Sequence, residues 1–187
     1  DVSMLDCQVA LLENPIARYG ASGTVPGPIG TRHPSMAPFD VYAAEDGGFV
    51  IAIGNDTAFR RLCELVALPA LAQDERFVTN AVRCVNEAEL KRLLEDKLRQ
   101  RPRAHWLQLL SDNGIPTGEY SSVAEVVNHP QIAAMITTVH APNGKELRVA
   151  ANPLTANEAQ SVVRRNPPVL DGDRERILQD FVAASAR

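Results

Sequence analysis

The stretch FDVYAAEDGGFVIAI, residues 39–53, decides the fold of this sequence. Two short runs rich in aromatic and β-branched residues, 39–44 and 49–53, flank the tetrapeptide EDGG. An Asp-Gly pair between two such runs predicts a β-hairpin, because both central residues of the favoured two-residue turn need a positive φ. We therefore expect two antiparallel strands here, closed by a tight turn with positive φ.

Helical spacing of apolar residues dominates the sequence after this hairpin. Asn55 or Asp56 is expected to cap the first of these helices, and Asn86 with Glu89 three residues later resembles a capping box. Near the end of the chain the pattern returns briefly to that of a strand. The expected elements are helices at 55–66, 87–99, 102–114, 123–127 and 173–184, and a strand at 147–150.

The sequence before the hairpin predicts a helix and a long connection. An apolar stripe at Leu5, Val9, Leu12 and Ile16 has helical spacing, and Asn14-Pro15 is expected to end or kink that helix. Residues 20–38 are rich in Gly, Pro, Ser and Thr, and a connection of this length is usually a linker or a functional loop. The succession of elements predicts an α/β or α+β protein.

The first residue is Asp1 rather than Met, and the apolar stripe that follows has no obvious partner in the next twenty residues. We therefore expect the chain to be part of a longer protein. The alternative is a natural N-terminus from which Met has been removed.

Composition excludes several classes of function. The chain has 187 residues, 45% of them hydrophobic and 22% charged, which is typical of a globular protein with a real core. A net charge of −4 does not favour nucleic acid as a partner, and no apolar run is long enough for a membrane span. The three widely spaced cysteines, Cys7, Cys63 and Cys84, do not fit a disulfide framework. A reduced, cytoplasmic location is expected, with Cys63 and Cys84 in core positions.

Common catalytic and ligand-binding motifs are missing from the sequence. None of the histidines has a partner at HxH or HxxxH spacing, so no metal site is expected. The sequence contains no P-loop, no GxGxxG and no GxSxG elbow.

Several ordered segments nevertheless resemble one family, the class III CoA-transferases, which include acyl-CoA transferases, carnitine dehydratases and 2-methylacyl-CoA racemases. They cover nearly the whole chain; the tail, LDGDR at 170–174, departs from the Leu-Gly-Glu-His-Thr-like stretch of the family. The segments that carry the resemblance are DVSMLD (1–6), GTRHP (30–34) with Pro38-Phe39 and Asp46-Gly47, IAIGND (51–56) with Phe59 and Leu62-Cys63, DERF (74–77) with Arg83 and Asn86, GIPTG (114–118), Glu125-Val126 with HPQ (129–131), NPL (152–154) and PPVL (167–170).

The resemblance implies an architecture. Family members have a large Rossmann-like domain and a small α+β domain, and two subunits interlock as a homodimer. Residues 1–187 would form the C-terminal part of such a protein. Residues 1–35 would be the connecting helix and linker loop, 36–140 the small domain, and 141–187 a segment that returns to the large domain.

The resemblance also implies a chemistry. In the transferases an aspartate attacks the acyl-CoA thioester, forms a mixed anhydride and passes CoA to an acceptor carboxylic acid. That aspartate precedes the segment matching 1–6, so no catalytic residue is assigned in this chain; Asp6 is expected to be a surface or capping residue. Coenzyme A would be a co-substrate, with no covalently bound cofactor.

One loop of this chain is implied to face the substrate. The residues concerned are Gly30, Thr31, Arg32, His33 and Pro34, because in the transferases the matching glycine-rich loop closes over the active site. Arg32 is suited to hold a carboxylate or a CoA phosphate, and His33 to move a proton. Against this stands a strong alternative, in which Arg32 is only a solvated surface charge and His33 only shapes the turn before Pro34.

Two other functions remain open on the sequence. One is an α-methylacyl-CoA racemase of the same family, in which a His and an Asp exchange the α-proton. The other is a non-catalytic piece that requires a partner chain.

Overall fold

The computed structural model describes residues 2–153, 155–156, 159–160 and 165–185. They form two compact units, 1–120 and 121–187. Asp1 and Leu154, which belong to segments matched above, lie outside the described residues. The expected division at 35/36 and 140/141 concerns a larger protein and stays a prediction.

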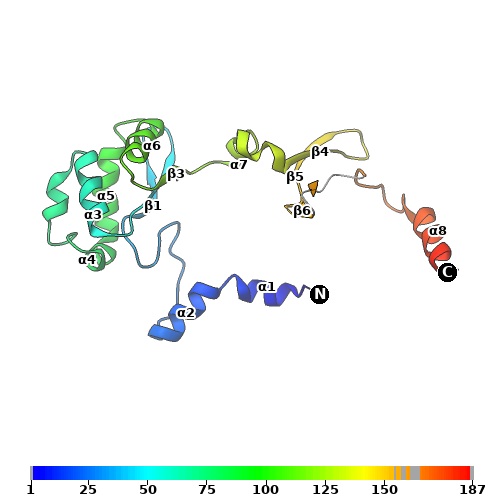
Figure 1. Ribbon diagram of the computed structural model, residues 1–187, viewed down its shortest axis with the longest axis horizontal. Helices are drawn as coiled ribbons and strands as arrows, with labels where there is room; N and C mark the ends of the chain where they lie inside the picture. The colour runs from blue at the N-terminus through cyan, green and yellow to red at the C-terminus, as the bar shows by residue number, and fades with distance from the viewer. Residues whose placement is uncertain (1, 154, 157–158, 161–164, 186–187) are drawn as a thin grey trace. The chain divides into compact units, whose positions relative to one another are not determined.

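The first unit is a small α+β body built on three strands (Figure 1). Its antiparallel sheet has the order β1-β2-β3, so the second strand of the hairpin is central. The elements of this unit are α1 (Met4–Ala10), α2 (Glu13–Ser22), β1 (Phe39–Ala43), β2 (Gly48–Ala52), α3 (Asp56–Leu65), the 3-10 helix η1 (Pro69–Gln73), α4 (Asn80–Val85), α5 (Glu87–Leu98), α6 (Arg103–Asp112) and β3 (Thr117–Glu119).

The hairpin expected from the sequence is present, with Ala43 opposite Gly48. Its turn differs from the expectation: neither Gly47 nor Gly48 has a positive φ, and the Ala44 N–H donates to the Gly47 carbonyl at 2.8 Å. A four-residue connection therefore replaces the two-residue turn. Gly48 is required for another reason, because a Cβ there would lie 3.1 Å from Cγ1 of Val41 and 3.2 Å from Cδ1 of Tyr120.

One hydrophobic core holds the sheet, α3, α5 and α6 together, and α1 and α2 contribute no buried residue to it. Alternate residues of β1 and β2 are buried, as a sheet with one covered face requires. The helices add the apolar stripes that the sequence predicts. The largest buried apolar side chains are Tyr42, Phe49, Ile51, Ile53, Phe59, Leu62, Phe77, Leu90, Leu94, Leu98, Trp106 and Leu110.

The start of the chain contains two helices where one was expected. Pro15 lies in the first turn of α2, where a missing N–H costs little, so Asn14-Pro15 does not end a helix there. The helix α2 continues to Ser22 and ends at Gly23, which has a φ of 68°. The long connection therefore begins after Gly23 and not at Gly20.

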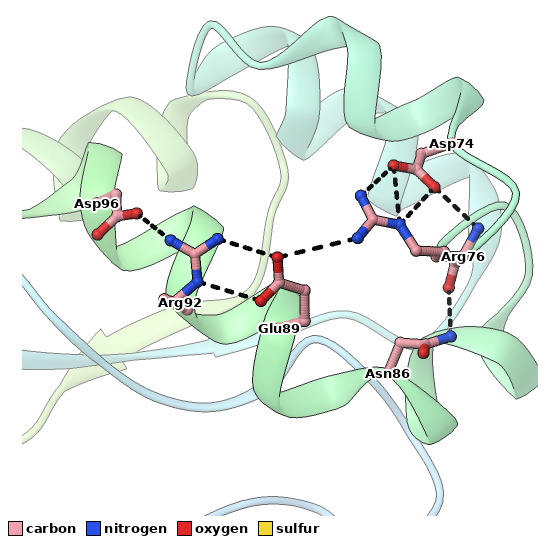
Figure 2. A network of polar contacts seen from close by, with 6 residues as sticks. All are labelled: Asp74, Arg76, Asn86, Glu89, Arg92 and Asp96. Carbon is pink, nitrogen blue, oxygen red and sulfur yellow. Dashed lines mark hydrogen bonds and ion pairs between the residues drawn. The ribbon is translucent and has the colours of Figure 1, made fainter.

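The start of α5 also differs from the expected capping box. The Asn86 side chain does not cap α5; its Nδ2 donates to the carbonyls of Arg76 and Val82 at 3.2 and 3.0 Å. Glu89 instead joins a surface network with Arg76 and Arg92 (Figure 2). In contrast, the expected cap of α3 is confirmed, with Asn55 Oδ1 accepting from the Ala58 N–H at 2.8 Å.

The second unit carries a hairpin and short helices. Its elements are α7 (Val123–Val126), the 3-10 helix η2 (Pro130–Met135), β4 (Ile136–His140), β5 (Glu146–Ala150), β6 (Thr155–Ala156), β7 (Ala159–Gln160) and α8 (Arg174–Ser185). The strand expected at 147–150 is β5, and its partner β4 was not foreseen. The capping box at the start of α7 joins Ser122 and Glu125.

The helix expected at the end of the chain is α8, but its apolar residues do not point into a core. Ile177, Leu178, Phe181 and Val182 are 55–72% exposed. The described elements make this a mixed α/β chain, as expected. Among the described residues, no helix is long and apolar enough to cross a membrane.

Candidate functional site

The site is the connection between α2 and β1, and in particular its last part, residues 30–39. Gly30 has a φ of 68°, a left-handed conformation that a side chain would strain. The five residues predicted to face a substrate follow one another here, half-buried or exposed. The connection is fixed to the body of the unit at two separate places, through the Thr31 side chain and through the backbone of Ala37.

The first attachment joins Thr31 to Asp40 and Lys91. The Thr31 hydroxyl donates to Oδ1 of Asp40 at 2.5 Å, and Lys91 Nζ donates to Oδ2 at 2.5 Å. The same Oδ1 accepts the Val41 N–H at 2.7 Å. Burial alone raises the pKa of Asp40, but these hydrogen bonds and the charge of Lys91 outweigh it and lower the pKa below its ordinary value. Asp40 therefore stays ionised and holds the start of the loop.

The second attachment joins the end of the loop to Arg83, whose side chain is fully buried. Its Nε donates to the Ala37 carbonyl at 2.6 Å, its Nη1 to the Phe77 carbonyl at 2.9 Å, and its Nη2 to Asp56 Oδ1 at 2.7 Å. The guanidinium also lies 4.4 Å from the ring centroid of Phe59. A planar, five-donor group is the side chain suited to bind three acceptors at once.

Asn80 fixes the backbone of the same segment. Its Oδ1 accepts the Ala37 N–H at 3.1 Å, and its Nδ2 donates to the Ser35 carbonyl at 2.9 Å. The side-chain amide of Asn80 thus accepts one hydrogen bond from the loop backbone and donates one to it, as a neighbouring β-strand would. The loop backbone from Ser35 to Ala37 is therefore held in one position.

His33 and Arg32 lie between the two attachments. The His33 N–H donates to the Phe39 carbonyl at 2.8 Å, and the imidazole stacks on the Phe39 ring with centroids 4.9 Å apart. Its Nδ1 accepts the Ser35 N–H at 3.2 Å, so Nε2 carries the proton in the neutral ring and is the nitrogen left to meet a ligand. Arg32 is half-buried, and no carboxylate within the described part of the chain pairs with it.

Sequence reasoning proposed the five loop residues and missed those that hold them. Arg83 was part of a matched segment, but nothing in its surroundings marked it as buried. Asp40 and Lys91 are 51 residues apart in the sequence. The available signal for Asp40 was its position in the strand. Asp40 lies two residues before Tyr42, so both side chains lie on the same, buried face of β1.

Within the part of the chain that the structure describes, the other polar candidates do not gather into a catalytic arrangement. His129 Nδ1 accepts the Gln131 N–H at 3.2 Å and caps the start of η2. Burial raises the pKa of Cys63 to about 12, which fits a core position and not a nucleophile. The described residues contain no group of three His, Cys, Asp or Glu side chains arranged to hold a metal ion.

The chain is similar to enzymes that transfer CoA. It is 38% identical to the acetyl-CoA:oxalate CoA-transferase of Acetobacter aceti, over 100% of this chain and 48% of that enzyme. It is 29% identical to the succinate–glutarate CoA-transferase of Agrobacterium fabrum, over 97% of this chain and 46% of that enzyme. The chain thus spans about half the length of the curated relatives it matches.

A solved structure and a family model agree with these relatives. A CAIB/BAIF family protein from Brucella suis superposes with a TM-score of 0.75 at 34% identity, over 94% of this chain and 46% of that protein. The position of these residues within a longer protein stays a prediction. The model of CoA-transferase family III matches residues 1–174, and the chain belongs to that family.

Proposed function

We propose that this chain is part of a CoA-transferase that moves CoA between an acyl-CoA thioester and a carboxylic acid. The reaction would run through an aspartyl–acyl anhydride, with the attacking aspartate outside residues 1–187. Membership of the family supports the reaction class. The relatives named above act on oxalate, succinate and glutarate, so a small dicarboxylate is the class of acceptor that we propose.

The observation that carries the proposal is the fixed loop with an uncompensated guanidinium. Arg32 has no carboxylate partner among the described residues, whereas the groups on either side of it are bonded to the body of the unit. A guanidinium without a carboxylate partner is available to a ligand that supplies the opposite charge. An acceptor carboxylate or a CoA phosphate has the planar or tetrahedral oxygens that a guanidinium binds in pairs.

The rigidity of the loop gives the proposal a physical role. An anhydride is destroyed by water, so a transferase must keep water from it during the exchange. A loop held by Asp40 and Arg83 loses little conformational entropy when it covers a substrate. We propose that residues 30–34 form that cover, with CoA as co-substrate and no covalently bound cofactor.

The assembly and location belong to the same proposal. We propose a cytoplasmic homodimer in which a Rossmann-like domain completes the active site. The exposed apolar side chains of α1 and α2, including Leu5 at 72% and Ile16 at 51% exposure, support a need for further protein against this part of the chain. The same exposure favours the second candidate function, that of a piece without activity until it is assembled.

A chimera tests the proposal. Residues 1–187 replace the matching part of the Acetobacter aceti transferase, and CoA exchange between acetyl-CoA and oxalate is measured. We expect exchange in the chimera and a loss of about 100-fold or more in kcat/KM for Arg32→Ala, the scale for removing a charge-paired contact. Arg18→Ala, an exposed cation on α2, is the control.

Two results count against the proposal. The first is a folded chimera that exchanges no CoA. The second is deuterium incorporation at the α-carbon of a 2-methylacyl-CoA without any acid acceptor, which would indicate the racemase instead.

A further inference from the structure

A cavity of about 210 Å³ lies in the first unit, away from the loop in sequence, where three helices meet. Residues at the ends of α3 and α5 and in the first turn of α6 line it, and it is open to solvent on one side. Figure 1 shows these three helices next to one another. Leu65, Val66 and Trp106 provide its apolar wall, and Lys97, Arg101 and His105 its polar rim. A space of this size accommodates a single ring, since an engineered cavity of about 150 Å³ binds benzene.

Most cations on α3 and α5 pair with a carboxylate, as Arg61, Lys91 and Arg92 do, whereas Arg60 and the cations at this cavity do not in the part of the chain that the structure describes. No carboxylate pairs with Lys97 or Arg101 among the described residues. Three acids on the same two helices pair with other cations: Glu64 with Arg61 at 3.3 Å, Glu95 with Arg99 at 2.9 Å, and Asp96 with Arg92 at 2.9 Å.

Figure 2 shows the paired cations on and beside α5. There Arg92 lies between Glu89 and Asp96, and Arg76 between Asp74 and Glu89, so each guanidinium has two carboxylates. Beyond the end of α5, Glu45 comes near Arg101 through its backbone, with its N–H donating to the Arg101 carbonyl at 3.1 Å. The Glu45 carboxylate makes no ion pair with Arg101 in the described structure.

The helix dipole explains the position of only one of these three residues, Lys97. A cation in the last turn of a helix is favoured by the partial negative charge there, and Lys97 occupies that position in α5. Arg101 and His105 come after the end of α5 and are not in its last turn. The carbonyls nearby are also already bonded: Leu98 O accepts the Trp106 indole N–H at 2.7 Å, and Cys63 O accepts the Leu68 N–H at 2.8 Å.

We infer that this cavity is a binding site for a small organic anion, a carboxylate carried on a flat apolar body. The apolar wall takes the body, and Lys97 and Arg101 bind the carboxylate, with the His105 imidazole as a further donor. This site is additional to the loop of the proposed transferase and does not depend on that function. A bare inorganic anion gains nothing from the apolar wall, and an uncharged ring leaves both cations unpaired.

The chain itself provides the probe, because Trp106 is its single tryptophan and lines the cavity. Tryptophan fluorescence of the 187-residue chain is titrated with sodium benzoate at constant ionic strength. We expect a saturable change with a dissociation constant on the order of 1–10 mM, which is typical of a ligand of this size. Benzyl alcohol and inorganic phosphate, which lack the charge and the ring respectively, should each bind at least about five-fold more weakly.

Variants separate this site from general surface charge. Lys97→Ala and Arg101→Ala are each expected to weaken benzoate roughly five-fold. Arg99→Ala is the matched control, because Arg99 lies between them in sequence, is paired with Glu95 and does not line the cavity. The proposal is overturned if wild type shows no saturable change, if benzyl alcohol binds as well as benzoate, or if Arg99→Ala weakens benzoate as much as the other two.

Discussion

The Nε of Arg83 donates a 2.6 Å hydrogen bond to the carbonyl of Ala37, 46 residues away in the sequence. This contact joins the end of the loop that we propose to face a substrate to the buried interior of the helical layer. Arg83 satisfies the Phe77 carbonyl and Asp56 at the same time, so one side chain holds three segments together. The buried Arg83 therefore fixes the position of the end of the loop.

Replacing Arg83 should destabilise the chain strongly. Arg83→Ala leaves the carbonyls of Ala37 and Phe77 without their donor, and we expect a loss of about 3 kcal/mol or more in the free energy of unfolding. Arg83→Lys should recover only part of it, because an ammonium cannot bond all three acceptors in this geometry. Urea unfolding of both variants measures the loss, with the exposed Arg92→Ala as control; equal midpoints for all would contradict the role of Arg83.

The contact of Asp40 with Lys91 should make stability depend on pH. The folded-state pKa of Asp40 is lowered, so its contribution is present above the unfolded value of about 3.9 and is lost as pH falls through the folded pKa. Asp40→Asn should lower the unfolding free energy at pH 7 by about 1–2 kcal/mol, with a smaller difference from wild type below pH 3. Asp96→Asn, at an exposed carboxylate, is the comparison. A difference that stays constant with pH would argue against the ionised pair.

Gly48 should not tolerate a side chain. A Cβ there would lie 3.1 Å from Val41 and 3.2 Å from Tyr120, so Gly48→Ala is expected to cost about 1–3 kcal/mol. Gly118→Ala lies in the neighbouring strand β3 with nothing within 4 Å of the added atom, and should be close to neutral. Thermal unfolding of the two variants compares them directly, and similar melting temperatures would refute the close approach.

The thiols should differ in reactivity. Cys63 is buried and its pKa is raised to about 12, so it should not be alkylated by iodoacetamide in the native chain at pH 8. Cys7 is exposed and should react. Mass spectrometry before and after unfolding in urea separates the two. Alkylation of Cys63 in the native chain would show that this part of the core opens.

Local signals in the sequence were sufficient for elements whose cause is local. The Asp-Gly pair indicated the hairpin, Asn55 capped α3, and Ser122 with Glu125 capped α7. Local rules misled where a residue had a distant partner. Asn86 had the sequence pattern of a cap, yet its amide bonds the carbonyl of Arg76.

The same distinction applies to the site. The loop residues follow one another and were found together, but the groups that fix them come from β1, α4 and α5. Nothing adjacent to Lys91 in the sequence indicates that it binds Asp40, because only the folded sheet and helix bring them together. Arg83 was likewise unrecognisable as a buried residue, since arginine is normally exposed.

The central claim is that this chain supplies a substrate-facing loop while the attacking carboxylate comes from elsewhere. The most direct measurement is isotope exchange between a labelled dicarboxylic acid and its CoA thioester, catalysed by the purified 187-residue chain alone, with mass spectrometry for acyl adducts. The account predicts no exchange and no adduct on any of its carboxylates. Turnover of the thioester by this chain alone would contradict it.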